Sequence, residues 1–325
     1  MFETRITKLF GIKYPIIGGC MQGLSRAAFV AAISNAGALG IIASAICQRK
    51  EELRDEIRKM KDLTDQPFAV NVNLFPTVRP ISVEEYIDVA IEEGVPILET
   101  SGRSPRAHME RIKQGGVKFM HKCARVRDAI SIERLGADAV SIVGFECGGH
   151  PAMEDVTSLI LVPLTVDSVS VPVIAGGGFV DGRGLVAALA LGAEAVVMGT
   201  RFMATKECPA HDNVKEWMLK ASESDTTIIQ RSIQSNSRVM KNAAALKVLE
   251  MEGRGVSFED LLTIIGGEHG REVIQQGEMD AGTLACGEAV GLIRDIPTVG
   301  EMVQSVMRQA GEVRRRVDGI AEAIG

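Results

Sequence analysis

The sequence has few of the residues that mark several classes of protein. Aromatic residues make up only 4% of its 325 residues, and its six cysteines are dispersed with no Cys-x-x-Cys pair. This spacing fits free thiols in a reducing cytoplasm better than a disulfide framework. The net charge of -6 gives no electrostatic reason to expect nucleic acid or an anionic membrane as a partner. No apolar stretch approaches the roughly 20 residues of a membrane span, and the first residues lack a signal-peptide hydrophobic region, so we expect a cytoplasmic protein.

Glycine is abundant instead, with 34 residues, and apolar runs alternate with helical patterns along the first two-thirds of the chain. The runs are apolar throughout, which is typical of parallel strands covered on both faces. Eight strand–helix units predict a closed (β/α)8 TIM barrel of the α/β class, and a doubly wound open sheet is the main alternative. The predicted strands are residues 14–18, 40–43, 68–72, 96–100, 117–121, 139–142, 171–175 and 195–198. The predicted helices between them are 26–35, 50–63, 83–93, 105–114, 126–135 and 185–191.

After residue 202 the pattern changes to helical runs without a convincing strand. We expect residues 1–204 plus 286–325 to form the barrel, and residues 205–285 to form an added helical lid or substrate domain at its C-terminal rim. The expected helices of the added domain are 214–221, 226–233, 243–250 and 258–264, and residues 286–293 and 299–324 are expected to return as closing helices.

Two glycine-rich turns follow the seventh and eighth predicted strands. The first comprises Gly176, Gly177 and Gly178, which let the backbone approach a phosphate closely. The second contains Gly199 and Thr200, which add N–H groups and a hydroxyl. Ordinary βα turns also contain glycine, which is the alternative interpretation. The spacing of a dinucleotide fingerprint fails because its last glycine position is an aspartate, so the turns predict a mononucleotide such as FMN.

Other strand ends supply polar groups to the same mouth. Cys20, Met21 and Gln22 follow the first strand and offer backbone groups and an amide. Asn71, in the third strand, could bind the edge of a flavin ring. Lys122 follows the fifth strand, and an ammonium group directed into the mouth would stabilise a reduced, anionic flavin by charge pairing. The alternative for Lys122 is a surface lysine whose stem packs while its head reaches water.

The loop after the sixth strand carries the strongest candidate for catalysis. Gly148 and Gly149 allow a tight turn beside a flat ligand, and His150 then stands at the carboxyl end of the strand. Cys147 and His150 are half of a zinc site, but no second half follows, so we expect no metal. Cys147 as a nucleophile, or a plain surface turn, remain alternatives. We prefer His150 as a general acid/base or hydrogen-bond donor near the flavin.

Together these motifs resemble the nitronate monooxygenase family, the former 2-nitropropane dioxygenases, and most of all its bacterial FMN-dependent NADH:quinone reductases. The resemblance covers nearly the whole chain and rests on residues 19–22, 67–71, 121–123, 144–151, 176–184 and 198–202. It implies a TIM barrel with FMN at the C-terminal mouth and a helical second domain over it. By position it implies flavin contacts at Met21, Gln22, Asn71, Lys122, Gly148 and Gly149, phosphate contacts at Gly177, Gly178, Gly199 and Thr200, and an active-site histidine at His150.

The resemblance leaves several activities open. The first is NAD(P)H oxidation with two-electron reduction of a quinone-like acceptor, for which residues 71–80 could form a proline-stiffened lid over the nucleotide. The second is oxidation of alkyl nitronates with oxygen, and the third is flavin-dependent enoyl-thioester reduction. A barrel that only binds FMN is the non-enzymatic alternative. Val143 departs from the polar or acidic residue that quinone-reductase relatives tend to carry, so flavin contacts could differ. We expect small-molecule substrates and a monomer or homodimer.

Overall fold

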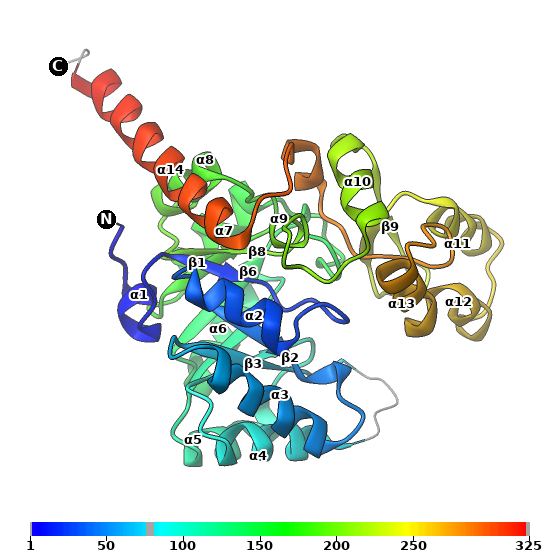
Figure 1. Cartoon of the computed structure of the whole chain (residues 1–325), viewed down its shortest axis with the longest axis horizontal. Coiled ribbons are helices and arrows are strands. Elements are labelled where there is room, and N and C mark those ends of the chain that lie inside the picture. The colour runs from blue at the N-terminus through cyan, green and yellow to red at the C-terminus, as the bar shows by residue number, and fades with distance from the viewer. Residues whose placement is uncertain (1, 76–80, 323–325) are drawn as a thin grey trace.

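The computed structural model describes residues 2–75 and 81–322. Its centre is one sheet of eight parallel strands in the order β1-β8-β7-β6-β5-β4-β3-β2 (Figure 1). The sheet is nearly closed, because Leu39 beside β2 accepts a hydrogen bond from Gly18 N at 2.8 Å and donates to Ile16 O at 3.0 Å. The predicted TIM barrel is therefore confirmed. The strands are β1 Ile16–Gly18, β2 Gly40–Ala43, β3 Phe68–Asn73, β4 Ile97–Ser101, β5 Lys118–Cys123, β6 Ala139–Val143, β7 Val173–Gly176 and β8 Ala195–Met198.

Amphipathic helices surround the strands. In α3, for example, Leu53, Ile57 and Met60 are buried at helical spacing while charged residues cover the opposite face. The helix of residues 158–166, which contains a proline and no charged residue, was not among the predicted helices. The surrounding helices are α2 Ala27–Asn35, α3 Lys50–Leu63, α4 Val83–Glu92, α5 Met109–Gln114, α6 Val126–Leu135, α7 Ser158–Val166, α8 Gly182–Ala190 and α14 Val299–Glu322, with short 3-10 turns η1 Ser44–Ile46 and η2 Arg106–His108.

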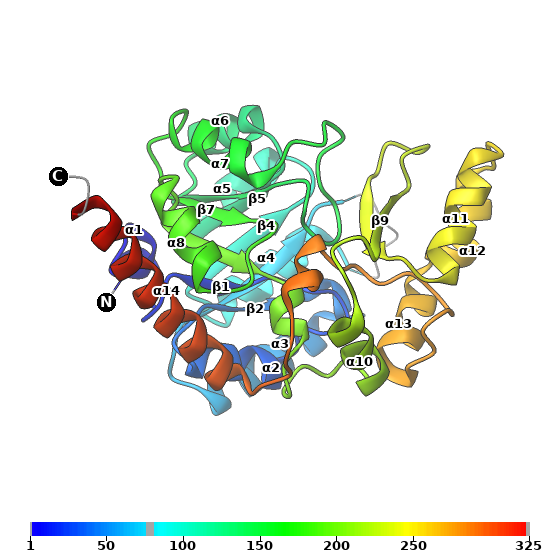
Figure 2. The ribbon, with the colours of Figure 1, turned by 90° about the horizontal axis from the view of Figure 1, so that it is seen from above.

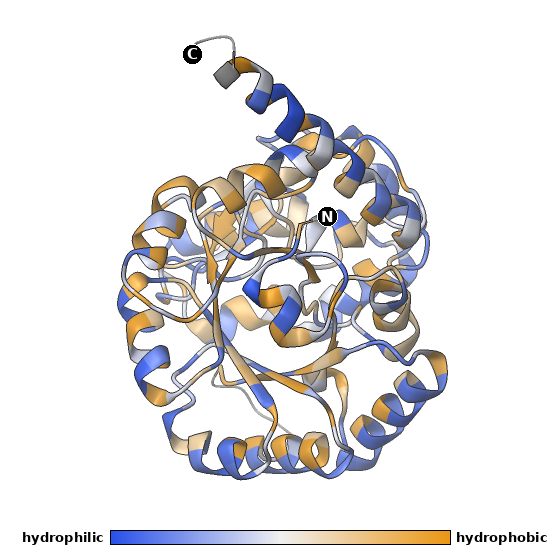
Figure 3. Cartoon of the chain, turned by 90° about the vertical axis from the view of Figure 1, so that its left-hand side faces the viewer, coloured by the Kyte–Doolittle hydropathy of each residue, from blue (hydrophilic) through white to orange (hydrophobic). Residues whose placement is uncertain are grey.

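The amino end of the barrel is covered and its carboxyl end is where ligands can enter. Helix α1, Arg5–Phe10, places Ile6 and Phe10 on a separate apolar cluster with inward-facing strand residues such as Ile97 and Ile174. Figure 3 looks at the barrel from this end, with the N-terminus near its centre. Because α1 closes the amino end of the barrel, we expect ligands to bind at the carboxyl end, where loops follow the strands.

Residues 205–285 lie beyond the carboxyl ends of the strands (Figure 2). One expectation for this region was wrong: residues 226–233 are not a helix, because β9 and β10 form an antiparallel hairpin. The β-branched run Thr226 to Ile229 favours a strand, although its spacing also fits a helix. Residues 286–293 form only a 3-10 turn. The elements between β8 and α14 are α9 Thr200–Met203, α10 Asp212–Lys220, β9 Thr226–Ile229, β10 Ser237–Met240, α11 Ala243–Gly253, α12 Phe258–Ile265, α13 Gly267–Gln276 and η3 Glu288–Leu292. The division into two domains stays a prediction.

Candidate active site

A cleft of about 1520 Å³ opens at the carboxyl end of the barrel. It is bordered by the loops after the strands and by the region around β10 and α13. Every predicted site residue lines it, namely Cys20, Met21, Gln22, Asn71, Lys122, Gly148, Gly149, His150, Gly176, Gly177, Gly178, Gly199 and Thr200. The sequence reasoning therefore brought together residues that share one cavity. Of the predicted lid, Asn71, Asn73 and Phe75 line the cleft, whereas residues 76–80 lie outside the described residues.

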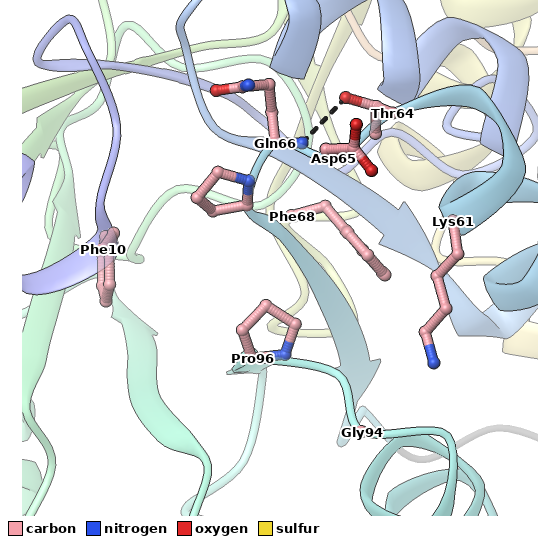
Figure 4. A pocket seen from close by; sticks show the side chains of 9 residues that line it. Phe10, Lys61, Thr64, Asp65, Gln66, Phe68, Gly94 and Pro96 are labelled. Atoms are coloured by element: carbon pink, nitrogen blue, oxygen red, sulfur yellow. Dashed lines mark hydrogen bonds between the residues drawn. The ribbon is translucent and has the colours of Figure 1, made fainter.

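A second hollow, of about 460 Å³, lies near the amino end of β3 (Figure 4). Phe10, Phe68 and Pro96 form its apolar wall, and Lys61 and Asp65 stand at its edge. None of the predicted site residues lines it. The chemistry suggested by the sequence is therefore confined to the larger cleft.

Behind the cleft lining, in contact with Asn71, lies a buried carboxylate that the sequence analysis missed. Glu99 of β4 is 1% exposed and accepts a hydrogen bond from Asn71 Nδ2 at 2.6 Å. The same amide nitrogen lies 3.3 Å from Ser101 Oγ. Because both contacts use the NH2 group of Asn71, its Oδ1 is left as the amide atom that can accept from a ligand. A charged residue within the otherwise uncharged strand 96–100 was the available signal.

Lys122, which lines the cleft, lies close to Glu99, with Nζ 3.9 Å from Oε1. Burial pulls the pKa of Lys122 down, but the charge of Glu99, together with the thiolate forms of Cys20 and Cys147 at high pH, offsets that effect, so the pKa lies above its usual 10.5. The ammonium group is therefore charged at neutral pH. Strand β5 runs two residues further than predicted, to Cys123, so Lys122 is part of the strand itself.

Burial keeps the His121 side chain and the thiols of Cys20 and Cys147 uncharged, which fits a structural role better than a catalytic one. The His121 side chain is buried, its Nδ1 lies 2.7 Å from Thr100 Oγ1, and burial lowers its pKa to about 4. Burial raises the pKa of the Cys20 and Cys147 thiols to about 12. Such thiols are protonated at neutral pH, which disfavours Cys147 as a nucleophile. Among the described residues, no group of three or more metal-ligating side chains exists.

The turn after β7 has the shape of a phosphate cradle. Gly177 and Gly178 have φ of +91° and +82°, which favour glycine. A Cβ on Gly177 would lie 2.9 Å from Ser158 Oγ, and that hydroxyl donates to Gly177 O at 2.8 Å. Within the described part of the chain, the N–H groups of Gly177, Gly178 and Gly199 donate to no protein oxygen. Several free N–H groups beside one cleft fit a phosphate.

Ser158 and Glu146 hold the glycine turn after β7 in place through hydrogen bonds. Ser158 is the first residue of α7, and its backbone N–H donates to both carboxylate oxygens of Glu146, at 3.1 and 3.0 Å. Gly176, by contrast, is packed tightly, since a Cβ there would lie 2.7 Å from Val197 and 2.8 Å from Val143. Its carbonyl oxygen also lies 3.0 Å from Ser158 Oγ, whose single hydrogen is donated to Gly177 O. Gly176 therefore shapes the cradle through packing.

Thr200 joins the cradle to residues far along the chain. Its Oγ1 accepts from Gly287 N at 2.9 Å. Gly148 packs on the same segment, because a Cβ there would lie 2.8 Å from Gly287 N. The two glycines thus allow backbone-to-backbone contact between the His150 loop and residues 286–287.

His150 stands at the end of a loop that β10 holds in place. Gly149, with φ +83°, donates to Arg238 O at 3.0 Å and accepts from Arg238 N at 2.6 Å. The His150 ring lies 4.8 Å from the Phe75 ring, centroid to centroid. The protein groups packed around its ring lower the pKa of His150 below 6.5 by desolvation, although the residue is exposed to solvent in the open cleft. The imidazole is therefore mainly neutral at pH 7.

Arg238 is the second residue that the sequence analysis missed. It is 3% exposed, its guanidinium lies 4.4 Å over the Phe145 ring, and Nε donates to Phe145 O at 3.1 Å. Nη1 pairs with Glu288 at 2.9 Å. These contacts anchor the start of the His150 loop to the hairpin. No local sequence signal could have found them, because the partners are separated by many residues.

The donor groups of the cleft match the parts of FMN. The free N–H groups suit its phosphate, Asn71 Oδ1 suits an N–H of the ring, and the Lys122 cation suits a ring that gains negative charge on reduction. Val143 is nearly buried and adds only apolar surface.

Comparison with known proteins gives consistent matches along the whole chain. A family model described as nitronate monooxygenase matches residues 3–309. The chain is 31% identical to a (3aS,4S,5R,7aS)-5-hydroxy-7a-methyl-1-oxo-octahydro-1H-indene-4-carboxyl-CoA dehydrogenase of Mycobacterium tuberculosis, over 95% of this chain and 96% of the relative. It is 30% identical to a probable nitronate monooxygenase of Staphylococcus saprophyticus, over 97% and 99% of the two chains.

Solved structures agree on the fold. FabK from Thermotoga maritima superposes with a TM-score of 0.90 at 35% identity, covering 98% of this chain and 100% of that one. A nitroalkane oxidase from Streptomyces ansochromogenes superposes with a TM-score of 0.82 at 23% identity, covering 96% and 99%. The second similarity supports the fold alone.

Proposed function

Because this chain belongs to the nitronate monooxygenase family of flavin-dependent oxidoreductases, we propose that it oxidises NAD(P)H and passes two electrons to a quinone-like acceptor with FMN as its cofactor. The observation that carries this proposal is the size of the cleft. Its volume of about 1520 Å³ exceeds the roughly 300–1,000 Å³ of a pocket for one drug-sized ligand. The cleft therefore has room for a second large ligand beside FMN.

Charge on the cleft wall supports an anionic second ligand. Arg103, in the loop after β4, and Arg271, in α13, both line the cleft and are exposed. Neither forms an ion pair with another described residue. Two guanidinium groups suit the diphosphate of a nicotinamide nucleotide, because arginine binds phosphate oxygens through paired hydrogen bonds.

In this proposal FMN, when bound, supplies the two-electron chemistry. Gly177, Gly178 and Gly199 hold its phosphate through their N–H groups, and Asn71 orients the ring through Oδ1. The Lys122 ammonium stabilises negative charge that develops on the ring. His150, as a neutral imidazole, holds the acceptor by donating a hydrogen bond from one ring nitrogen and accepting one at the other, and water supplies the proton that completes the reduction. Phe75 packs on that ring and limits the access of water.

Anaerobic mixing of the yellow protein with NADH, NADPH or propyl nitronate tests the proposal. Bleaching within seconds by NADH or NADPH is expected, and Arg271→Met should raise the nucleotide concentration needed for half-maximal rate by about tenfold. Arg316→Met, an equal loss of charge on the exposed surface of α14, should change nothing. Failure of both nucleotides to bleach the flavin would overturn the proposal.

A second candidate is oxidation or reduction of a coenzyme A thioester. The named CoA dehydrogenase relatives favour it, and the same cleft would admit a phosphate-bearing carrier. Nitronate oxidation is the third, favoured by the relatives named probable nitronate monooxygenase. Bleaching by propyl nitronate, without bleaching by either nucleotide, would select nitronate oxidation. Reoxidation of the reduced protein by crotonyl-CoA, but not by a quinone, would select the coenzyme A thioester reaction.

A further inference from the structure

The carboxylate of Glu99 belongs to a polar layer inside the barrel, between the apolar core and the cleft. Ile97 of β4 and Met120 of β5 belong to the inner apolar cluster. Glu99 and Lys122 follow two residues further along the same strands, so they lie on the same inner face. Lys122 and Asn71 line the cleft, whereas Glu99 lies behind them and is 1% exposed. Glu99 can therefore act on a ligand only through these two neighbours.

Each oxygen of the Glu99 carboxylate faces a different neighbour. Oε2 accepts from Asn71 Nδ2 at 2.6 Å, and Oε1 lies 3.9 Å from Lys122 Nζ. An ionised carboxylate only accepts, so its contact requires the NH2 group of Asn71 and leaves Oδ1 to a ligand. The second distance is longer than a hydrogen bond. The N–H groups of Lys122 are therefore not consumed by Glu99.

Glu99 also supplies the charge that opposes Lys122. The titratable groups that act on Lys122 are Glu99 and the thiols of Cys20 and Cys147. Burial raises the pKa of both thiols to about 12, so they are uncharged at pH 7. A ligand beside Lys122 is thus close to a pair of opposite charges rather than to a lone cation. Such a pair attracts an anion more weakly than the cation alone would.

We propose that Glu99 is a positioning residue that limits how strongly the cleft stabilises reduced FMN. This inference rests on the proposed function, because it needs the flavin ring to lie beside Asn71 and Lys122. Reduced FMN carries negative charge on its ring, so positive charge nearby raises its reduction potential. Glu99 offsets the charge of Lys122 and keeps that potential low. The enzyme then passes its electrons to the acceptor instead of retaining them.

The reduction potential of the FMN-loaded protein, measured against a reference dye without oxygen at pH 7, tests the proposal. Glu99→Gln removes the charge but keeps the side-chain size and an acceptor for Asn71. It should raise the ratio of reduced to oxidised flavin at a given potential by at least about tenfold, which is about 30 mV for a two-electron couple. The ring of oxidised FMN is uncharged, so its dissociation constant should change by less than about threefold.

Three further variants separate the charge from other effects. Glu99→Asp keeps the charge, and its ratio of reduced to oxidised flavin should stay within about twofold of wild type. Glu154→Gln is the matched control, because Glu154 also lines the cleft but its side chain is 45% exposed and screened by water. Its potential should equal that of wild type. Glu99→Ala leaves room for water beside Asn71, and it should show the tenfold shift if Glu99→Gln fails to fold.

The outcomes distinguish this inference from the proposed function. FMN-loaded Glu99→Gln or Glu99→Ala with the wild-type potential would overturn the inference alone and leave Glu99 a purely structural role. An equal shift in Glu154→Gln would also overturn it, because any lost carboxylate would then have the same effect. A tenfold shift in a protein whose FMN neither NADH nor NADPH reduces would support the inference and overturn the proposed function. Absence of FMN binding by wild type would overturn both.

Discussion

Replacing Glu99 by Gln removes the charge that faces Lys122 and keeps the side-chain size. The two charges are 3.9 Å apart, with Glu99 buried and the Lys122 side chain 23% exposed. Their attraction is about 4 kcal/mol at an effective dielectric constant of about 20. The glutamine oxygen can still accept from Asn71, and water can reach part of Lys122. We therefore expect Glu99→Gln to lower the free energy of unfolding by about 2–3 kcal/mol at pH 7.

The pH dependence of this loss has a definite sign. In wild type the pKa of Lys122 is above 10.5, so the stabilisation by the pair is complete below pH 10.5 and is lost as pH rises through the folded value. Without Glu99, we expect burial to outweigh the remaining effects and to bring the pKa of Lys122 below 10.5. The variant can then release the buried proton as pH rises, so its deficit should shrink between pH 7 and pH 10.

Urea unfolding of both proteins at the two pH values measures the effect. Glu250→Gln is the matched control, because it removes the same charge from a pair with Arg254 whose members are 59% and 70% exposed. The control should be as stable as wild type. A Glu99→Gln variant of wild-type stability at pH 7, or a deficit that stays constant up to pH 10, would refute the reasoning about the Glu99–Lys122 pair.

Three further predictions concern the cradle, the loop and the histidine. Gly178→Ala and Gly116→Ala should each lower the free energy of unfolding by about 1–2 kcal/mol, because both glycines have a positive φ. Only Gly178→Ala should also raise the dissociation constant of FMN, by at least about tenfold. Arg238→Met should speed amide hydrogen exchange at Gly149 several-fold. Because desolvation holds the pKa of His150 below 6.5, NAD(P)H turnover should stay flat from pH 7 to 8 and fall as His150 gains a proton in acid.

Each of these has a result that would count against it. The prediction for Gly178 is wrong if both alanine variants bind FMN like wild type. Gly116 is the control because it has φ +64° and no atom within 4 Å of an added Cβ, so its alanine variant has a similar backbone strain at a position that does not line the cleft. The loop account is wrong if exchange at Gly149 is unchanged in Arg238→Met. The histidine assignment is wrong if His150→Gln keeps the wild-type rate and pH profile.

The barrel and most of the cleft could be predicted because their signals are local. Strands buried on both faces are apolar runs, and parallel strands bring residues such as Asn71 and Lys122 to one end of the sheet. The region after residue 202 was harder, because the run Thr226 to Ile229 fits both a helix and a strand until its pairing with β10 is known.

The remaining site residues depend on contacts across the chain. Glu99 gains its role from Asn71 on the neighbouring strand, and only the register of β3 against β4 places them together. Arg238 acts through Gly149 and Phe145, which no spacing within the sequence relates to it. Ser158 begins a helix whose uniform apolarity hid it from a search for amphipathic patterns.

The central claim is that backbone N–H groups after β7 and β8 bind a phosphate and so position a flavin beside His150. Fluorescence titration of the flavin-free protein with FMN and with riboflavin tests it most directly. Each hydrogen bond to a charged phosphate contributes about 1.5–3 kcal/mol, so the loss of two predicts riboflavin binding at least about 100-fold weaker than that of FMN. Equal affinity for the two flavins, or no binding of FMN, would contradict the account.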